Sequence, residues 1–310
     1  MVKESLRDQY GKTLAELGSS DPNVIVLDAD LAKSTKTLTF ANEFKDRFFD
    51  MGLSEQDMIS TAAGISLTGK TVFASSFSVF LTGRVFDQVR QSVCYNNANV
   101  KLVATHSGLG VGEDGATHQS LEDIALMRTL PNMRVIVPAD SIETAEVIKY
   151  VAGEYGPFYI RLTRSDLPVI HTDEFKFSPG KAEVLSSGDD LVIISAGAMI
   201  HKAIEASVQL RNLSISAGVI NLSSIKPLDE DTIIGEAMRS GNVITIEDHS
   251  VYGGIGSAVA ELLSQRVSAR MKIIGVENSF GRSGKPEELY SLYNLTTERI
   301  IEEAKILTGK

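Results

Sequence analysis

Short, uninterrupted apolar runs rich in β-branched residues recur along this chain, separated by segments of helical period. In the first half of the sequence, such runs occupy residues 24–27, 72–75, 100–103, 134–137 and 158–161. The segment before the first run places its apolar side chains on one helix face, at Leu6, Tyr10, Leu14 and Leu17. Strands that are apolar on both faces are typical of parallel sheets covered by helices on each side. The pattern therefore predicts an α/β fold built on a parallel sheet.

A second series of the same kind follows in the last third of the chain. Apolar runs at residues 191–194, 215–220, 243–246 and 272–276 alternate with helical stretches at 200–211, 230–238 and 256–265. Residues 165–190 contain Pro168, Pro179, Gly180 and Gly188 and lack helical period, which indicates a connection between two cores. We therefore expect two α/β domains with parallel sheets, at residues 1–175 and 189–310, joined by a linker at 176–188.

Charge and cysteine content restrict the classes of partner and compartment. The 310 residues carry a formal charge of −10, which disfavours broad electrostatic binding to nucleic acid or to an anionic membrane. Any anionic ligand must then be bound by locally placed cations. The chain has one cysteine, Cys94, and charged residues interrupt its apolar first turns, so no disulfide, signal peptide or membrane span is expected. These features predict a cytoplasmic protein.

A glycine-rich loop at residues 105–119 directly follows the apolar run at 100–103 and is the strongest local signal of a site. It places His106, Glu113, Asp114 and His118 among four glycines. Ligands of parallel α/β folds bind at the carboxyl ends of the strands, and imidazoles with carboxylates suit proton transfer and hydroxyl recognition. We expect a small polyhydroxylated substrate here; the alternative is a turn with incidental polar residues. The loop lacks the lysine of a phosphate-binding P-loop, and the histidine spacing does not indicate a metal site.

A carboxylate precedes an aromatic-rich segment in the first half of the chain. Ser54 and Asp57 are placed to cap a helix over 59–68, with Glu55 in its first turn, and phenylalanines follow at 73, 77, 80 and 86. A carboxylate beside aromatic rings can recognise a flat heterocycle through a hydrogen bond and stacking. Helix capping and ordinary core packing are the alternative explanations.

Basic residues that could bind a phosphate lie near strand and helix ends. Arg161 and Arg164 close the apolar run at 158–161, and Arg7 lies near the start of the first helix. Guanidinium groups at such places can hold a phosphate bidentately, whereas surface salt bridges are the alternative. Helix starts are indicated by capping patterns at residues 120–123 and 140–143. The spacing of the arginines does not decide between the two roles.

The sequence around the glycine-rich loop resembles that of the transketolases, which are thiamine diphosphate enzymes. The resemblance is carried by residues 110–119 (GVGEDGATHQ) and 162–168 (LTRSDLP), and it extends to 7–8, 26–31, 131–132, 138–140 and 281–285. It covers the pyrimidine-binding domain of that family, here residues 1–175, and its C-terminal domain, here residues 189–310. The diphosphate-binding domain has no counterpart, and no Gly-Asp-Gly followed by a distant Asn occurs. The chain thus resembles the C-terminal subunit of a split transketolase.

This resemblance implies that the chain binds the pyrimidine half of thiamine diphosphate. Glu55 matches the glutamate that hydrogen-bonds the aminopyrimidine and relays a proton through it. Phe77 and Phe80 match aromatic residues that hold this ring. Gly83 stands where many relatives have a third aromatic residue, which Phe86 could replace if its helix turns it inward. A divalent cation such as Mg²⁺ is expected on a separate diphosphate-binding subunit, in an α2β2 assembly, and no metal is expected on this chain.

The resemblance also implies a set of substrate residues. Asp30 matches a position near the thiazolium, and His106 and His118 match histidines around the donor carbonyl and hydroxyl groups. Asp114 matches an acid that recognises a sugar hydroxyl. The implied reaction is reversible transfer of a two-carbon ketol group from a ketose phosphate to an aldose phosphate, in the pentose phosphate pathway. The implied binding residues for the sugar phosphate are Arg7, Ser34 and Arg164.

Three other functions remain open from the sequence. Within the same cofactor class, the chain could be an α-keto acid dehydrogenase β-subunit or a deoxyxylulose phosphate synthase-like enzyme, although the loop at 113–118 and the segment 164–168 favour transketolase. The glycines at residues 252–257 suggest a nicotinamide-dependent oxidoreductase, but the full dinucleotide fingerprint is missing. A non-catalytic assembly subunit is the third.

Overall fold

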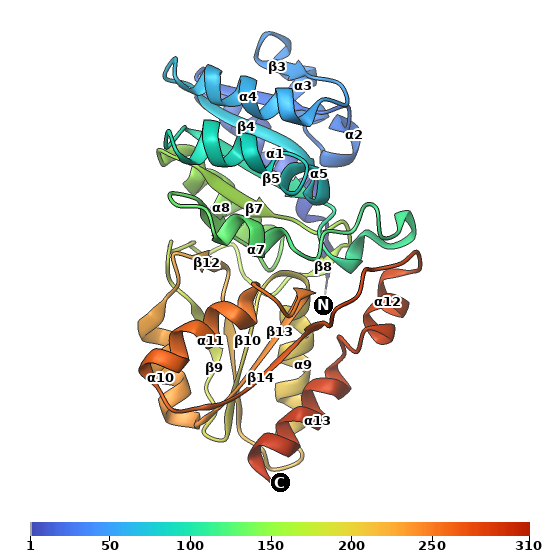
Figure 1. Ribbon diagram of the computed structural model, residues 1–310, viewed down its shortest axis with the longest axis vertical. Helices are drawn as coiled ribbons and strands as arrows, with labels where there is room; N and C mark the ends of the chain where they lie inside the picture. The colour runs from blue at the N-terminus through green and yellow to red at the C-terminus, as the bar shows by residue number, and fades with distance from the viewer. Residues whose placement is uncertain (1) are drawn as a thin grey trace.

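The computed structural model describes residues 2–310, which form two α/β domains stacked along the long axis of the molecule (Figure 1). The first sheet has seven strands in the order β12-β6-β7-β5-β4-β2-β3. Only β12 runs antiparallel to its neighbour, and the other pairs are parallel. The strands are β2 (Val24–Asp28), β3 (Phe48–Asp50), β4 (Thr71–Phe77), β5 (Val100–Thr105), β6 (Arg134–Ile136), β7 (Phe158–Arg161) and β12 (Ser224–Lys226).

Helices cover both faces of this sheet, because its central strands are buried on both sides. Helices α1 and α8 pack together on one face, and α4 packs with the π-helix η2 on the other. The helices are α1 (Leu6–Ser20), α2 (Ala32–Thr35), α3 (Leu38–Glu43), α4 (Glu55–Ser66), α5 (Ser78–Thr82), α6 (Phe86–Gln88), α7 (Asp123–Arg128) and α8 (Ser141–Gly153), with the shorter η1 (Lys45–Arg47), η2 (Val89–Cys94) and η3 (Leu109–Asp114).

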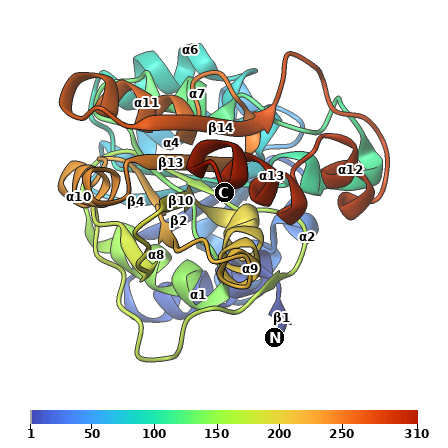
Figure 2. The same ribbon diagram turned by 90° about the horizontal axis from the view of Figure 1, so that it is seen from below.

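The second sheet has five strands in the order β14-β13-β10-β11-β9, of which only β9 is antiparallel to its neighbour. Its strands are β9 (Glu183–Ser186), β10 (Leu191–Ser195), β11 (Ala217–Asn221), β13 (Asn242–Ser250) and β14 (Arg270–Val276). Its helices are η4 (Gly197–Met199), α9 (Ile200–Arg211), α10 (Glu230–Ser240), α11 (Ile255–Arg266), α12 (Pro286–Leu292) and α13 (Thr297–Thr308), and α9 lies beside α13 (Figure 2). The predicted α/β class with two mainly parallel sheets is confirmed.

Strand pairing between the two parts of the chain connects the domains. Strand β9 lies inside the segment 176–188 that the sequence analysis assigns to the linker, and it extends the second sheet. Strand β12 follows the second domain's β11 in the chain but pairs with β6 of the first sheet. A further two-stranded sheet joins β1 (Lys3–Glu4) to β8 (Leu167–Pro168). The connection between the domains is therefore structured and hydrogen-bonded rather than a free tether.

The two predicted capping patterns have different outcomes. Asp140 is the N-cap of α8 and accepts from the Glu143 amide, while the Glu143 side chain accepts from the Ala139 amide at 2.7 Å, so this signal is confirmed. The pattern at 120–123 is wrong, because α7 begins at Asp123 and no side chain caps it. Asp123 is instead fully buried and bound to other elements. Among the described residues, no helix is long and apolar enough to span a bilayer.

Candidate active site

Four neighbouring strands of the first sheet bring most of the predicted site residues to one edge. Strands β7, β5, β4 and β2 are adjacent and parallel, so their carboxyl ends point the same way. Phe77 ends β4, His106 follows β5, Asp30 follows β2 and Arg164 follows β7. This edge is where parallel α/β sheets bind ligands.

An aromatic wall lines this edge. The rings of Phe77 and Phe80 lie 5.9 Å apart and are nearly parallel, at 11°. Phe77 also stacks on the imidazole of His106, with centroids 3.7 Å apart. His118, from the glycine-rich loop, approaches Phe80 edge-on at 5.4 Å. Residues from three segments of the chain thus build one face that suits a flat ring.

His106 is buried within this wall and carries no charge near neutral pH. Burial, helped by the positive charges of Arg7 and Arg164, lowers the pKa of His106 to about 3. Its Nδ1 lies 2.9 Å from the hydroxyl of Thr105, which leaves Nε2 for another partner. A neutral imidazole in this position can exchange hydrogen bonds with a carbonyl or hydroxyl group of a substrate.

Glu55 is the first residue of α4 and its side chain is 2% exposed. Both of its carboxylate oxygens accept from Nη1 of Arg84, at 3.0 Å each. The Arg84 guanidinium also lies over the Phe80 ring, with Cζ 4.3 Å from the centroid. Ser54 occupies the N-cap position of α4, as predicted, but its side chain makes no capping hydrogen bond. Arg84 therefore connects the buried carboxylate to the aromatic wall.

Sequence reasoning missed Arg84, although a signal was present. Phe80 and Arg84 are four residues apart, a spacing that brings side chains together on a helical turn. Phe86, the suggested replacement for a third pocket aromatic, packs instead against the core below α4 and, within the described residues, forms no ring pair with Phe77 or Phe80. Gly83 is exposed.

The predicted sugar-phosphate residues form a connected group. Arg7 donates from Nη1 to the carbonyl of Ser34 at 2.9 Å and from Nη2 to the carbonyl of Arg164 at 3.0 Å. Arg164 donates to the carbonyl of Val111 at 2.6 Å and lies 3.3 Å from the Asp114 carboxylate. The buried Nε of Arg7 has no hydrogen-bond partner within the described residues, so this group keeps donor capacity for an anion.

The other arginine considered for phosphate binding, Arg161, has a different position. Its side chain is 5% exposed, and its Nε donates to the Asp123 carboxylate at 2.7 Å while Nη2 donates to the carbonyl of Asp248 at 2.8 Å. The same Asp123 oxygen accepts from Tyr159 at 2.6 Å and Ser78 at 2.8 Å. The sequence left phosphate binding and ion pairing open for Arg161, and the structure favours ion pairing, because the guanidinium is buried and paired with Asp123.

Asp30 follows β2 at the same edge of the sheet. It is exposed, and its amide donates to the carboxylate of Asp50 at 3.0 Å. Its backbone has φ of 61°, which turns the chain sharply after β2. The structure thus brings His106, His118, Phe77 and Phe80 together, whereas Asp30 is hydrogen-bonded to Asp50.

The second domain holds the glycine-rich loop in place. The Leu109 amide donates to Asp248 of β13 at 2.8 Å, and the Ser283 hydroxyl donates to the carbonyl of Glu113 at 2.5 Å. Gly108 has φ of 66°, and a Cβ there would lie 2.1 Å from an Asp248 oxygen, so only glycine fits. One role of the second domain is therefore to fix the loop that carries His106 and His118.

The nicotinamide alternative is disfavoured by the start of α11. The carboxylate of Glu247 accepts from the amides of Ile255 at 2.6 Å and Gly256 at 2.8 Å. A Cβ at Gly254 would lie 2.0 Å from a Glu247 oxygen, so the glycine makes room for this internal cap. The helix N-terminus that a pyrophosphate would need is already occupied by a buried side chain.

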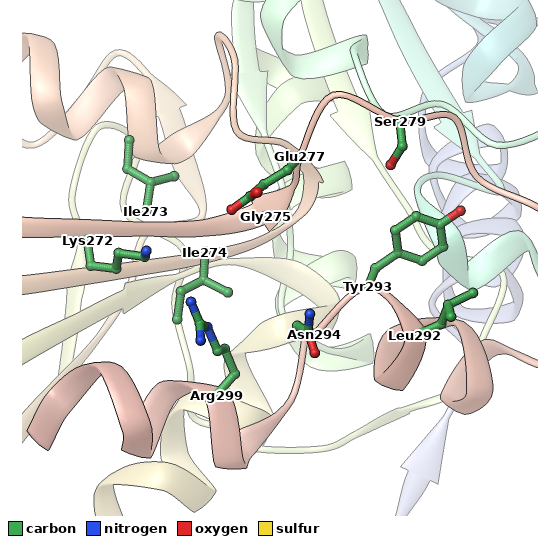
Figure 3. A pocket seen from close by; sticks show the side chains of 10 residues that line it. All are labelled: Lys272, Ile273, Ile274, Gly275, Glu277, Ser279, Leu292, Tyr293, Asn294 and Arg299. Atoms are coloured by element: carbon green, nitrogen blue, oxygen red, sulfur yellow. The ribbon is translucent and has the colours of Figure 1, made fainter. Parts of the chain in front are cut away.

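Another polar pocket lies in the second domain, between β14 and the start of α13 (Figure 3). Two cations border it, Lys272 and Arg299, and both already pair with Glu303. An apolar groove lies closer to the loop, between Val79 and the exposed Phe280. No group of three His, Cys, Asp or Glu side chains suited to a metal occurs in residues 2–310.

Comparisons with known proteins give a consistent family. A family model described as "Transketolase, pyrimidine binding domain" matches residues 3–169, and one described as "Transketolase, C-terminal domain" matches residues 180–300. A transketolase C-terminal section from Methanocaldococcus jannaschii is 47% identical over 98% of both chains. The 6-deoxy-6-sulfo-D-fructose transketolase subunit SqwH from a Clostridium species is 37% identical, covering 98% of this chain and 95% of that protein.

Among solved structures, a split gene transketolase described as an inactive beta4 tetramer superimposes with a TM-score of 0.92. It is 44% identical to this chain, and the match covers 98% of each. The folds of both domains, and their arrangement in one polypeptide, are thus shared with that protein.

Proposed function

The chain belongs to the transketolase family, and on this basis we propose that it is the subunit of a split transketolase that binds the aminopyrimidine half of thiamine diphosphate. The observation that carries the proposal is a buried carboxylate, Glu55, that Arg84 connects to Phe80, whose ring lies nearly parallel to that of Phe77. A flat heterocycle with ring nitrogens is a ligand that such a pair of features recognises. The residues present therefore fit the pyrimidine half of the cofactor.

Thiamine diphosphate, when bound, supplies a carbon nucleophile that accepts the two-carbon ketol group. Glu55 would hold the pyrimidine by a hydrogen bond and move a proton at its ring nitrogen, and Phe77 and Phe80 would contact the ring face. Neutral His106 would hydrogen-bond the donor carbonyl, and His118 would lie beside it. Glu55 and His106 are buried, so little water competes for their hydrogen bonds.

Substrate binding is assigned to the loop and the arginine group. Arg7 and Arg164, which lie against Ser34, would bind the phosphate of a ketose or aldose phosphate, and Asp114 would accept from a sugar hydroxyl. Asp30, at the end of β2, is proposed to face the thiazolium side. We propose the pentose phosphate reaction, ketol transfer between sugar phosphates, while the relative named for 6-deoxy-6-sulfo-D-fructose indicates that other sugars are handled in the family.

In this proposal a second subunit provides the diphosphate-binding domain and its metal motif, because relatives matched over nearly their whole length are described as a transketolase C-terminal section and a transketolase subunit. We propose a partner that supplies both, with Mg²⁺, in an α2β2 complex in the cytoplasm. The beta4 tetramer of the similar split-gene protein, which is described as inactive, supports the requirement for a partner.

The test is reconstitution with a diphosphate-binding subunit, thiamine diphosphate and Mg²⁺. We expect ketol transfer only from the full mixture, and Glu55→Gln should lower kcat by about 10²–10⁴-fold, the usual contribution of a general acid–base group. Glu43→Gln, at an exposed position of α3, is the matched control and should leave kcat unchanged. Strong activity of the chain alone, or a fully active Glu55→Gln complex, would refute the proposal. Pyruvate consumption in place of ketose cleavage would favour an α-keto acid dehydrogenase β-subunit or a deoxyxylulose phosphate synthase.

A further inference from the structure

Arg84 makes the two contacts that the proposed function assigns to the aminopyrimidine ring. Its planar guanidinium covers the face of Phe80 at 4.3 Å, and its Nη1 donates to both oxygens of Glu55 at 3.0 Å. An aminopyrimidine is also planar and also brings nitrogen donors to a carboxylate. The arginine side chain and the ring would therefore compete for Glu55 and for the surface of Phe80.

The ion pair is incompatible with the proton transfer proposed for Glu55. A carboxylate bound to a guanidinium accepts hydrogen bonds and has no proton to give. To pass a proton to a ring nitrogen, Glu55 needs a partner other than Arg84. Because the Glu55 side chain is 2% exposed, losing Arg84 without a replacement would leave a buried charge unpaired. Exchange of one partner for the other avoids that cost.

The surroundings of Arg84 leave it free to move. Its side chain is 48% exposed, and its only side-chain hydrogen bonds within the described residues are those to Glu55. The preceding Gly83 is open, since a Cβ placed there would meet only the Val79 carbonyl, at 3.9 Å. A half-exposed arginine beside an open glycine can rotate into solvent without disturbing the core.

We propose that Arg84 is a displaceable cover of the pyrimidine pocket, which pairs with Glu55 in the cofactor-free chain and leaves it when the cofactor binds. The proposal rests on the assignment of Glu55 and Phe80 to the pyrimidine. The Arg84 end of the pair is 48% exposed and screened by solvent, so removing it as a competitor should have the effect of losing a surface pair, which corresponds to about a 1.4- to 5-fold tighter dissociation constant.

The experiment is calorimetric titration of the reconstituted complex with thiamine diphosphate at fixed Mg²⁺. Arg84→Ala should bind the cofactor about 1.4- to 5-fold more tightly than the parent, and Arg84→Gln, which also removes the charge, should shift affinity in the same direction. Arg90→Ala, at an exposed position six residues later, is the matched control and should bind like the parent. Thermal melting of each variant confirms folding.

Each result decides the proposal. Unchanged or weaker binding by Arg84→Ala would overturn it, since that outcome describes a residue that supports the cofactor or has no role. Cofactor binding by the Glu55→Gln variant distinguishes failure of this proposal from failure of the proposed function. If the parent binds and Glu55→Gln weakens binding, the pyrimidine assignment stands whatever Arg84 does. If the parent complex does not bind thiamine diphosphate, both proposals fail.

Discussion

Breaking the buried ion pair between Asp123 and Arg161 should be among the most destabilising single changes in this protein. Asp123 is fully buried, and one of its oxygens accepts from Arg161, Tyr159 and Ser78, at 2.7, 2.6 and 2.8 Å. Ser78 directly follows Phe77, so this pair lies immediately behind the aromatic wall. Asp123→Asn would remove the carboxylate that pairs with the guanidinium of Arg161, which is 5% exposed.

The expected cost follows from that burial. Removing one partner of a buried ion pair lowers the free energy of unfolding by about 3–5 kcal/mol, because water cannot solvate the charge that remains. For a cooperative unit of 150–250 residues, each kcal/mol lowers the melting temperature by about 2–4 °C, so we expect a loss of about 6–20 °C. Arg161→Met should lower the free energy of unfolding by a similar amount, because it leaves the buried Asp123 carboxylate without its cationic partner.

The assay is calorimetry or thermal melting of the two single variants and of the double variant Asp123→Asn/Arg161→Met. Replacing both charges removes the unpaired group, so the double variant should melt above either single variant. Asp189→Asn is the control, because its pair with Arg239 is 3.4 Å long and Asp189 is 82% exposed, which limits the expected loss to about 1 kcal/mol. A single variant that loses less than about 1 kcal/mol, or a double variant whose loss equals the sum of the singles, would refute this reasoning.

Two further predictions concern pH and substrate binding. Burial by itself lowers the pKa of His171, but its hydrogen bonds to Asp140 (2.9 Å) and Glu183 (2.8 Å) outweigh this and raise the pKa to about 10 from an ordinary 6.5. The protonated imidazole therefore contributes stability that is complete below pH 6.5 and is lost as the pH rises through about 10. Burial lowers the pKa of Lys101 to about 7, so the contribution of Lys101 to the free energy of unfolding rises with pH over the same range. The test is therefore the difference in the free energy of unfolding between the parent and His171→Gln, measured in urea at pH 6.5, 8.5 and 10. A difference that does not shrink with rising pH would contradict this assignment. Arg164→Met in the reconstituted complex should raise KM for a sugar phosphate by about 10- to 100-fold, which corresponds to the loss of a charge-assisted hydrogen bond. KM for the unphosphorylated sugar should stay unchanged. An equal effect on both sugars would show that Arg164 does not bind the phosphate.

Much of the local structure was predictable because short-range pattern and burial agree. The apolar run at residues 191–194 became β10, and the helical stretch at 200–211 became α9 with the same bounds. The Asp140 cap was also predictable from the sequence, because an acceptor and a glutamate three residues later accept hydrogen bonds from backbone amides of the same turn. In such cases the partner lies a few residues away, and the sequence contains both.

Side chains whose partners are distant in sequence were not predictable. Arg161 and Arg164 are three residues apart and look alike in sequence, but Arg161 pairs with Asp123 beneath the wall while Arg164 reaches the loop at Val111. The same holds for Arg84, whose partner Glu55 lies 29 residues away on another helix. Burial and charge pairing decided the role of each arginine.

The fold class, the family and the segments that carry the site could be inferred from the amino-acid sequence, because apolar periodicity and the loop at 105–119 are local properties of the chain. The side chains that meet in the site depend on the three-dimensional arrangement of the strands. The strand order β7-β5-β4-β2 placed His106 on Phe77, and the second domain's Asp248 fixed the loop at Leu109. Contacts across 29 to 139 residues depend on how the sheets are ordered and packed, and no local pattern encodes that order.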